Sequence, residues 1–307
     1  MSDVFSQAMR ASRVLLDAAT AAAHELRLFE VLPERSDAIA LRLGVAPRRL
    51  RALLRALLLD HTLVEEDGQL VCRSVPPPPR VPRTGWGRLA EVIRTDRPLS
   101  TDAVDGVDGD ALRRFHDHLR SGGADAAREV SSKLGPLGPL LDLGCGSGAY
   151  AEAFLEDRPG ERAIVVDRPA VLELTRASVP RAEPVSLELL GGESWPRGAR
   201  IALLANVLHL FSAAEAARLV ERAAQAVEPG GTVAVKDFDA ATAGGVLFSL
   251  NMALYTDAGE VHSAEALRGF FADAGLGDVR FERLRCDPDS LLVQATALRG
   301  ASQMATR

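Results

Sequence analysis

From residue 139 onward, short apolar runs alternate with stretches of helical periodicity, and this alternation constrains the fold more than any other feature of the sequence. The predicted strands are 139–143, 162–167, 186–190, 199–206, 232–238, 279–284 and 290–298. Strands separated by helices form largely parallel sheets that are covered on both faces. We therefore predict an α/β fold with a seven-stranded, mostly parallel sheet.

The N-terminal part of the chain is mainly helical by its periodicity and is rich in alanine, leucine and arginine. Ser36 is the predicted N-cap of one helix that stops at Gly44, and Pro47 lies near the start of the next helix. A hairpin is predicted to follow, with its turn at Asp67 and Gly68. Helix, helix and hairpin in this order are typical of a winged helix.

The second of these helices carries Arg48, Arg49, Arg51 and Arg55. In a winged helix such arginines can bind DNA. The formal net charge of −6 and the pI of about 5.6 favour a solvated arginine face on a dimerisation and substrate-lid module instead. We therefore expect no nucleic-acid partner.

Composition indicates two domains and a reducing compartment. A chain of 307 residues that is 47% hydrophobic can bury two cores, and the proline-rich stretch 75–87 is the predicted extended connector. Cys72, Cys145 and Cys286 have no metal-ligand or disulfide spacing. The N-terminal residues form no targeting segment and no run reaches membrane-spanning length, so we expect a cytoplasmic protein.

The stretch "LDLGCGSGAY" joins the first predicted strand to a helix through Gly144, Gly146 and Gly148. Glycines without Cβ atoms allow a tight turn and expose N–H groups at the start of the helix, which suits a nucleotide-like ligand. The same motif also fits dinucleotide binding, with Ala149 in the last position. By itself it does not distinguish the two.

Polar residues follow the predicted strand ends, where open α/β sheets bind their ligands. Asp142 precedes the first glycine by two positions, and Asp167 ends the second strand 23 positions after Gly144. A carboxylate there can accept hydrogen bonds from both ribose hydroxyls of NAD or of S-adenosylmethionine. Glu193 follows the third strand on the expected adenine side, and the fourth strand ends in "ANVLH".

Together these motifs resemble the S-adenosylmethionine-dependent small-molecule O-methyltransferases of plants and bacterial natural-product pathways. "LDLGCGSGAY" is similar to their first cofactor motif, "VVDRPAV" to their second-strand motif, and "GGES" to their adenine-side motif. "LHLFSAAEAARLVERAAQAVEPGGTVAVKDF" is similar to the segment that carries their catalytic base. The resemblance covers nearly the whole chain. It implies a Rossmann-like class I methyltransferase domain, a winged-helix dimerisation domain, and a homodimer that methylates a small aromatic or polyketide-like molecule.

The resemblance also implies domain boundaries. Residues 1–87 would hold the winged-helix-like dimerisation domain and the proline-rich linker. Residues 88–137 would form a helical connector that lines the substrate pocket, and residues 138–307 would form the S-adenosylmethionine-binding domain.

The implied cofactor contacts gather at the glycine loop and the strand ends. They are Asp142, Gly144, Gly146, Gly148, Asp167, Arg168, Glu193, Ser194 and Asn206. The Asp142 carboxylate suits the ammonium group of the cofactor's amino-acid tail. Glu193 stands in place of the family's aspartate, and Ser194 in place of an apolar adenine contact.

His209 aligns with the family's catalytic histidine, and a histidine suits removal of a proton from an acceptor hydroxyl. Asp237, 28 residues further on, is the expected acceptor for its other ring nitrogen, with aspartate in place of glutamate. Glu260 matches the second acid of the family with a slip of one residue. Leu210 and Phe211 replace the acidic residue and the tryptophan that often follow the histidine.

Residues expected to contact the acceptor are His116, His118, Asn251, Met252 and Tyr255. Met252 and Tyr255 at helical spacing are also typical of a core. His116 and His118 are two residues apart and point to different helix faces, so we expect no metal site.

Other functions stay open at this stage. One is N- or C-methylation, or a member that retains the cofactor for hydroxylation or rearrangement; His209 and Asp237 together favour proton abstraction. The others are an NAD-dependent oxidoreductase and a DNA-binding regulator, which a gel shift would detect through salt-dependent affinity.

Overall fold

The computed structural model describes residues 2–83, 85–99 and 109–298, with side chains from residue 12 onward. The chain divides into two compact units. The first comprises Met1–Ser100 and Ala240–Val261, and the second comprises Thr101–Asp239 and His262–Arg307. The predicted division at 1–87, 88–137 and 138–307 runs consecutively along the chain and does not separate out the returning segment Ala240–Val261.

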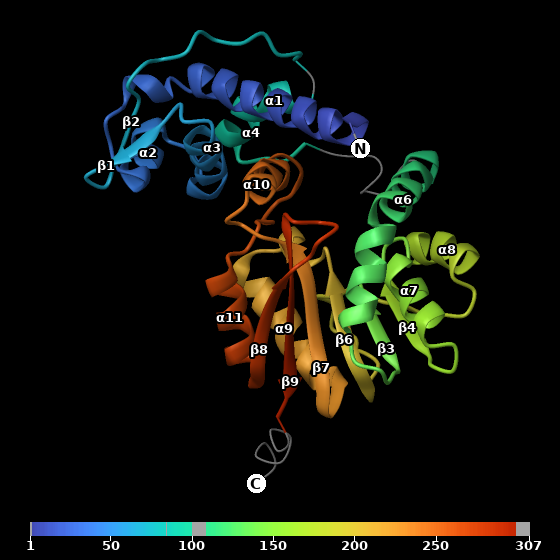
Figure 1. Cartoon of the computed structure of the whole chain (residues 1–307). Coiled ribbons are helices and arrows are strands. Elements are labelled where there is room, and N and C mark those ends of the chain that lie inside the picture. The colour runs from blue at the N-terminus through green and yellow to red at the C-terminus, as the bar shows by residue number, and fades with distance from the viewer. Residues whose placement is uncertain (1, 84, 100–108, 299–307) are drawn as a thin grey trace. The chain divides into compact units, whose positions relative to one another are not determined.

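The first unit is mainly helical (Figure 1). Its elements are α1 (Ser2–Glu25), η1 (Leu28–Glu30), α2 (Ser36–Leu43), α3 (Pro47–Leu59), β1 (Val64–Glu66), β2 (Gln69–Val71), η2 (Gly85–Arg88), α4 (Leu89–Thr95) and α10 (Ala243–Tyr255). The apolar faces of α1, α3, α4 and α10 share one core, in which Leu53 and Leu250 are fully buried. The returning helix α10 is therefore part of the core of this unit.

Local signals in the first unit are largely confirmed. β1 and β2 pair antiparallel, and Asp67 and Gly68 in the turn between them both have positive φ. Gly44 ends α2 with φ of 65°. Ser36 is not the N-cap of α2, because the extended residue before the helix is Arg35 (φ −74°, ψ 147°) and Ser36 is already helical.

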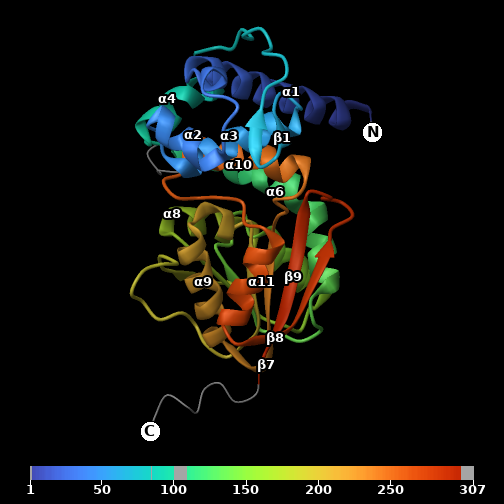
Figure 2. The same ribbon diagram turned by 90° about the vertical axis from the view of Figure 1, so that its left-hand side faces the viewer.

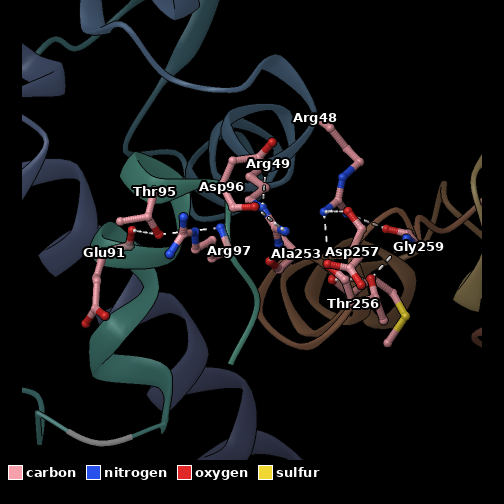
Figure 3. A network of polar contacts seen from close by, with 11 residues as sticks. Arg48, Arg49, Glu91, Thr95, Asp96, Arg97, Ala253, Thr256, Asp257 and Gly259 are labelled. Atoms are coloured by element: carbon pink, nitrogen blue, oxygen red, sulfur yellow. Dashed lines mark hydrogen bonds and ion pairs between the residues drawn. The ribbon is translucent and has the colours of Figure 1, made fainter. Parts of the chain in front are cut away.

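The arginines of α3 differ from the predicted solvated face. Arg49 is fully buried and donates to Asp96 Oδ1 at 2.6 Å and to the carbonyl of Ala253 in α10 (Figure 3). Arg55 donates to the carbonyl of Ala240 at the start of the returning segment. The prediction is wrong at these positions because the returning segment supplies backbone carbonyls that need donors.

The second unit is built on one seven-stranded sheet of order β5-β4-β3-β6-β7-β9-β8. Its strands are β3 (Leu140–Leu143), β4 (Ala163–Asp167), β5 (Glu183–Ser186), β6 (Ala199–Ala205), β7 (Val227–Phe238), β8 (Leu276–Arg283) and β9 (Ser290–Ala297). β3 to β7 pair in parallel, and β9 is antiparallel to both β7 and β8. The predicted seven-stranded, mostly parallel α/β fold is confirmed.

The third predicted strand, 186–190, is displaced. The strand in the structure is β5, which ends at Ser186. Leu189 and Leu190 pack against the core from a loop. The carbonyl of Leu189 accepts a hydrogen bond from the Arg222 guanidinium at 2.6 Å. The apolar pattern of residues 186–190 thus indicates side chains that pack against the core, and not a strand of the sheet.

Helices cover both faces of this sheet (Figures 1 and 2). They are α6 (Gly109–Lys133), α7 (Ala149–Asp157), α8 (Pro169–Ser178), η3 (Leu208–Leu210), α9 (Ala213–Ala226) and α11 (Ala264–Asp273). α9 and α11 pack on one face, and α6, α7 and α8 on the other. α9 begins with the predicted capping box, in which Ser212 and Glu215 bond reciprocally. Among the described residues, no helix is both long and apolar enough to cross a membrane.

The strand order reverses between β3 and β6, where the chain runs outward to opposite edges of the sheet. Ligands of open α/β sheets bind outside the carboxyl ends of the strands at such a point. The loop after β3 contains the three glycines, and the segment after β6 contains His209. The fold therefore places the two main candidate segments beside one another.

Candidate functional site

The glycine loop between β3 and α7 is closely packed at two of its glycines. A Cβ on Gly144 would lie 2.8 Å from Val207 Cγ2, and one on Gly148 would lie 2.7 Å from Thr175 Cγ2. Gly146 has more room but has φ of 52°. Backbone conformation and close packing thus account for the glycine pattern before any ligand is considered.

Asp167, at the end of β4, is bonded to the glycine loop. Its Oδ2 accepts the Gly146 N–H at 2.9 Å, and its Oδ1 accepts the Arg168 N–H at 2.8 Å. Burial raises the pKa of Asp167, and these two amides act in the opposite direction. Arg168 itself is exposed and is the N-cap of α8.

Asp142 in β3 is only 1% exposed, and neither carboxyl oxygen has a hydrogen-bond partner of normal geometry. Burial, with a smaller contribution from the Asp167 charge, raises the pKa of Asp142 to about 7. A buried carboxyl without a donor is rare in folded proteins. It marks the place where a ligand with a donor or a positive charge would be stabilised.

His209 in η3 and Asp237 in β7 form a buried pair. His209 Nδ1 lies 2.6 Å from Asp237 Oδ1, and the His209 backbone N–H donates to Asp237 Oδ2 at 3.1 Å. The side chains are 6% and 5% exposed. Both the ring and the backbone of His209 are therefore fixed by one carboxylate.

The ionised form of Asp237 is favoured by its neighbours. Burial alone would raise its pKa, but the His209 ring, the Phe238 amide and the Lys236 charge outweigh burial and hold the pKa below its usual value. The Phe238 ring also packs edge-on against His209, with ring centroids 5.9 Å apart. Asp237 is thus held as a carboxylate beside the His209 ring.

His262, which was not predicted from the sequence, lies just before α11 and contacts η3. It is buried, and its Nε2 lies 3.0 Å from the carbonyl of Leu208, the residue before His209. Its ring packs on Phe270 in α11. Its sequence position two residues after the predicted acid Glu260 was the only available signal.

Asn206 follows β6 in a left-handed conformation with φ of 57°. Its side-chain Oδ1 accepts a hydrogen bond from the buried Lys236 ammonium at 2.8 Å, and the same ammonium lies 2.8 Å from Asp287 Oδ2. Lys236 and Asp287 were not predicted. A charged residue inside an apolar strand was the signal that could have revealed Lys236, whereas Asp287 lies between β8 and β9.

Glu193 and Ser194 lie exposed on the loop between β5 and β6. Arg222 of α9 holds this loop: its guanidinium donates to the carbonyls of Leu189 at 2.6 Å, Gly191 at 2.8 Å and Glu193 at 2.5 Å. It also stacks on the buried Trp195, 4.5 Å from the ring centroid. Arg222 alone therefore binds three carbonyls of the loop that carries Glu193 and Ser194.

Four of the candidates belong to the first unit. Asn251, Met252 and Tyr255 lie on α10, where Met252 is buried and Tyr255 packs edge-on against Trp86. Glu260 lies after the end of this helix and is half-buried.

The turn before Glu260 is bound by Arg48 (Figure 3). Its guanidinium donates to the carbonyls of Gly259 at 2.6 Å, Asp257 at 2.8 Å and Thr256 at 3.2 Å. Burial and the Arg49 charge lower the pKa of Arg48, and acidic neighbours that include Glu260 oppose this effect. Arg48 thus has a structural task at the end of α10.

The two histidines of α6 differ in environment. His116 is buried, and its Nε2 has no hydrogen-bond partner, whereas His118 is exposed. Within the described ranges, no group of three or more His, Cys, Asp or Glu side chains is arranged to hold a metal ion.

Comparison with known proteins gives one family match. A model of the O-methyltransferase domain matches residues 112–277. Acetylserotonin O-methyltransferase of Bos taurus is 29% identical over 232 residues, which cover 68% of this chain and 66% of that enzyme, just under two thirds of its length. The tetracenomycin polyketide synthesis 8-O-methyl transferase TcmO of Streptomyces glaucescens is 27% identical over 94% of both chains.

A solved structure shows the same fold. Human N-acetylserotonin methyltransferase in complex with SAM superposes with a TM-score of 0.63, at 20% identity, over 96% of both chains. The similarity extends through both units of the chain.

Proposed function

Since this chain belongs to the O-methyltransferase domain family, we propose that it transfers a methyl group from S-adenosylmethionine to a hydroxyl of a small aromatic or polyketide-like molecule. The observation that carries this proposal is the buried His209–Asp237 pair, with Nδ1 and Oδ1 2.6 Å apart, at the sheet edge next to the glycine loop. A base of this kind is needed when the acceptor is a hydroxyl.

The residues at the sheet edge fit the cofactor. The unpartnered Asp142 carboxyl suits the ammonium group of the amino-acid tail, because a buried acid is stabilised by an opposite charge. Asp167 suits the ribose hydroxyls, and the glycine loop brings backbone amides close. The loop of Glu193 and Ser194 would bind the adenine side, with Gly144, Gly148, Arg168 and Asn206 bordering the site. When bound, the cofactor supplies an electrophilic methyl group on its sulfonium sulfur.

His209 takes the acceptor's proton in this proposal. Asp237 occupies Nδ1, so Nε2 is the nitrogen that accepts the proton, and the ionised Asp237 stabilises the imidazolium that forms. The burial of both side chains keeps bulk water from the charged pair. Glu260, on the turn held by Arg48, is the proposed second acid.

The substrate class is inferred from the relatives. The bovine relative is named for acetylserotonin and the Streptomyces glaucescens relative for a tetracenomycin polyketide. His116, His118, Asn251, Met252 and Tyr255 are the proposed acceptor contacts. The exposed Leu210 next to His209 favours an apolar acceptor surface over a cationic one.

Assembly and location complete the proposal. We place the dimer contact on the first unit, where Leu41 is 83% exposed and Val14 is 50% exposed, since apolar side chains of this size gain by being covered. The free cysteines Cys72, Cys145 and Cys286 support a reducing, cytoplasmic setting.

Calorimetric titration with S-adenosylmethionine and S-adenosylhomocysteine tests the cofactor first. We expect micromolar binding that Asp167→Ala abolishes or strongly weakens. Phenolic acceptors are then screened for methylation with His209→Ala as the inactive control. Binding of NAD(H) or DNA in place of both adenosyl ligands would overturn the proposal.

A further inference from the structure

The buried Lys236 helps lower the pKa of Asp237, but no contact with a ligand has been assigned to it or to the residues it binds. It is 2% exposed, and it is one of only two lysines in the chain, the other being Lys133 on α6. Burying an ammonium group is costly unless it is paired and hydrogen-bonded. A buried lysine next to a ligand site is therefore a candidate for a function in that site.

The contacts of Lys236 orient Asn206. An ammonium group has three donors, and two of them go to Asn206 Oδ1 and Asp287 Oδ2, both at 2.8 Å. Asn206 also donates its backbone N–H to the carbonyl of Lys236 at 2.7 Å. Since Oδ1 of the amide faces the ammonium, the NH₂ group of Asn206 faces away from it as a donor.

A second donor lies next to Asn206. The Tyr150 hydroxyl, on the first turn of α7 directly after the glycine loop, is buried without a hydrogen bond of normal geometry. Burial and the charges of Asp287 and Asp142 raise its pKa, and Asn206 opposes this, so the hydroxyl stays protonated and lies among these groups. It is a donor without an acceptor.

The donors of Asn206 and Tyr150, together with the carboxyl group of Asp142, are complementary to a zwitterion. Asn206 and Tyr150 offer N–H and O–H groups backed by the Lys236 charge, which suits a carboxylate. Asp142 offers a carboxylate without a donor, which suits an ammonium group. An α-amino acid carries both groups on one carbon atom.

We propose that Lys236 is a positioning residue that orients Asn206, so that Asn206 and the neighbouring Tyr150 hydroxyl bind the carboxylate of the cofactor's amino-acid tail, while Asp142 receives its ammonium group. This inference rests on the proposed use of S-adenosylmethionine. It assigns to three residues, Lys236, Asn206 and Tyr150, the recognition of one end of that molecule.

Two ligands separate this role from general support of the fold. S-adenosylhomocysteine has the full amino-acid tail, and S-adenosyl-3-thiopropylamine is the same molecule without the carboxylate. Calorimetry with both ligands is done on the wild type, Lys236→Met and Asn206→Asp. Asn206→Asp has the same shape, retains an acceptor for Lys236, and turns the proposed ligand donor into an acceptor. It therefore keeps the test open if Lys236→Met does not fold.

We expect both variants to bind S-adenosylhomocysteine about tenfold or more weakly than the wild type, because a charge-assisted hydrogen bond is lost. Binding of the analogue without the carboxylate should change by less than about threefold. The matched control is Lys133→Met, which removes the other lysine from its ion pairs with Glu282 and Glu129 and should change neither affinity. Restored discrimination in Lys236→Arg would add support.

Equal weakening of both ligands, or no weakening of either, would overturn the role of Lys236 and leave the proposed function intact. If the wild type binds neither ligand, the proposed function itself fails. The two failures are therefore distinguishable in one set of titrations.

Discussion

The Asp237 carboxylate binds His209 through two different groups, the ring Nδ1 at 2.6 Å and the backbone N–H at 3.1 Å. One side chain thus fixes both the place of η3 and the direction of the imidazole. The position of the His209 ring and its tautomer consequently depend on the same residue.

Asp237→Asn should separate these two tasks. The amide can still accept one hydrogen bond, but its NH₂ group opposes a protonated Nδ1 and no longer stabilises the imidazolium. We expect kcat to fall by about 10²- to 10⁴-fold while cofactor binding is retained. Stopped-time methylation assays and calorimetry on the same preparation measure both quantities. Unchanged kcat would show that Asp237 serves η3 alone.

Asp142→Asn should stabilise the protein without ligand while impairing its use of the cofactor. The pKa of Asp142 is raised to about 7 in the folded chain, so stability falls as the pH rises from about 4 to about 7, where the unfolded state has already released its proton. The Asp142→Asn variant has no such loss. Its free energy of unfolding should exceed that of the wild type by about 2–4 kcal/mol at pH 8, with little difference at pH 4.

Urea unfolding of both proteins across this pH range measures the effect. The same variant should bind S-adenosylhomocysteine at least about tenfold more weakly, because the ammonium group loses its counter-charge. A variant that is no more stable at pH 8 than the wild type would contradict the burial of an unpartnered carboxyl.

Arg222→Lys should loosen the loop that carries Glu193 without affecting the chemical step. A lysine cannot reproduce three planar donor contacts and the stacking on Trp195. We expect the KM for the cofactor to rise by about tenfold and kcat to stay within about twofold. Hydrogen exchange of residues 188–195 should speed up. Arg218→Lys, one turn earlier on α9 and exposed, is the matched control.

Gly148→Ala and Gly146→Ala should differ in what they damage. At Gly148 the new Cβ meets Thr175 and Val179 within 2.8 Å in a left-handed conformation, which should cost about 2–4 kcal/mol of folding free energy. At Gly146 only the backbone strain of about 1–2 kcal/mol applies. Chemical denaturation gives both values. Equal destabilisation would mean that the contacts at Gly148 relax.

Features with a local pattern could be predicted from the sequence. Periodicity located six of the seven strands, and the third was predicted at 186–190 where the structure has Glu183–Ser186. The turn at Asp67 and Gly68 and the capping box of Ser212 depend on neighbouring residues only. The pairing of His209 with Asp237 was expected from strand ends and family motifs, because parallel strands bring their carboxyl ends to one edge.

Features that depend on distant packing could not be predicted. The burial of Arg49 depends on the carbonyl of Ala253, which lies 204 positions away. The loop of Leu189 shows a strand-like pattern because its apolar side chains reach the core. Lys236 is one of only two lysines in the sequence, but only its contacts with Asn206 and Asp287 give it a function to test.

The return of Ala240–Val261 to the first unit affects the order in which the chain matures. A ribosome releases the N-terminal helices first, yet the core that they share with Leu250 and the carbonyl that pairs with Arg49 arrive only after β7 has been made. The N-terminal unit must therefore wait, incompletely packed, through the synthesis of nearly half the protein. No single cut in the gene yields it whole, and a truncation before residue 240 leaves the buried Arg49 with Asp96 but without the carbonyl of Ala253.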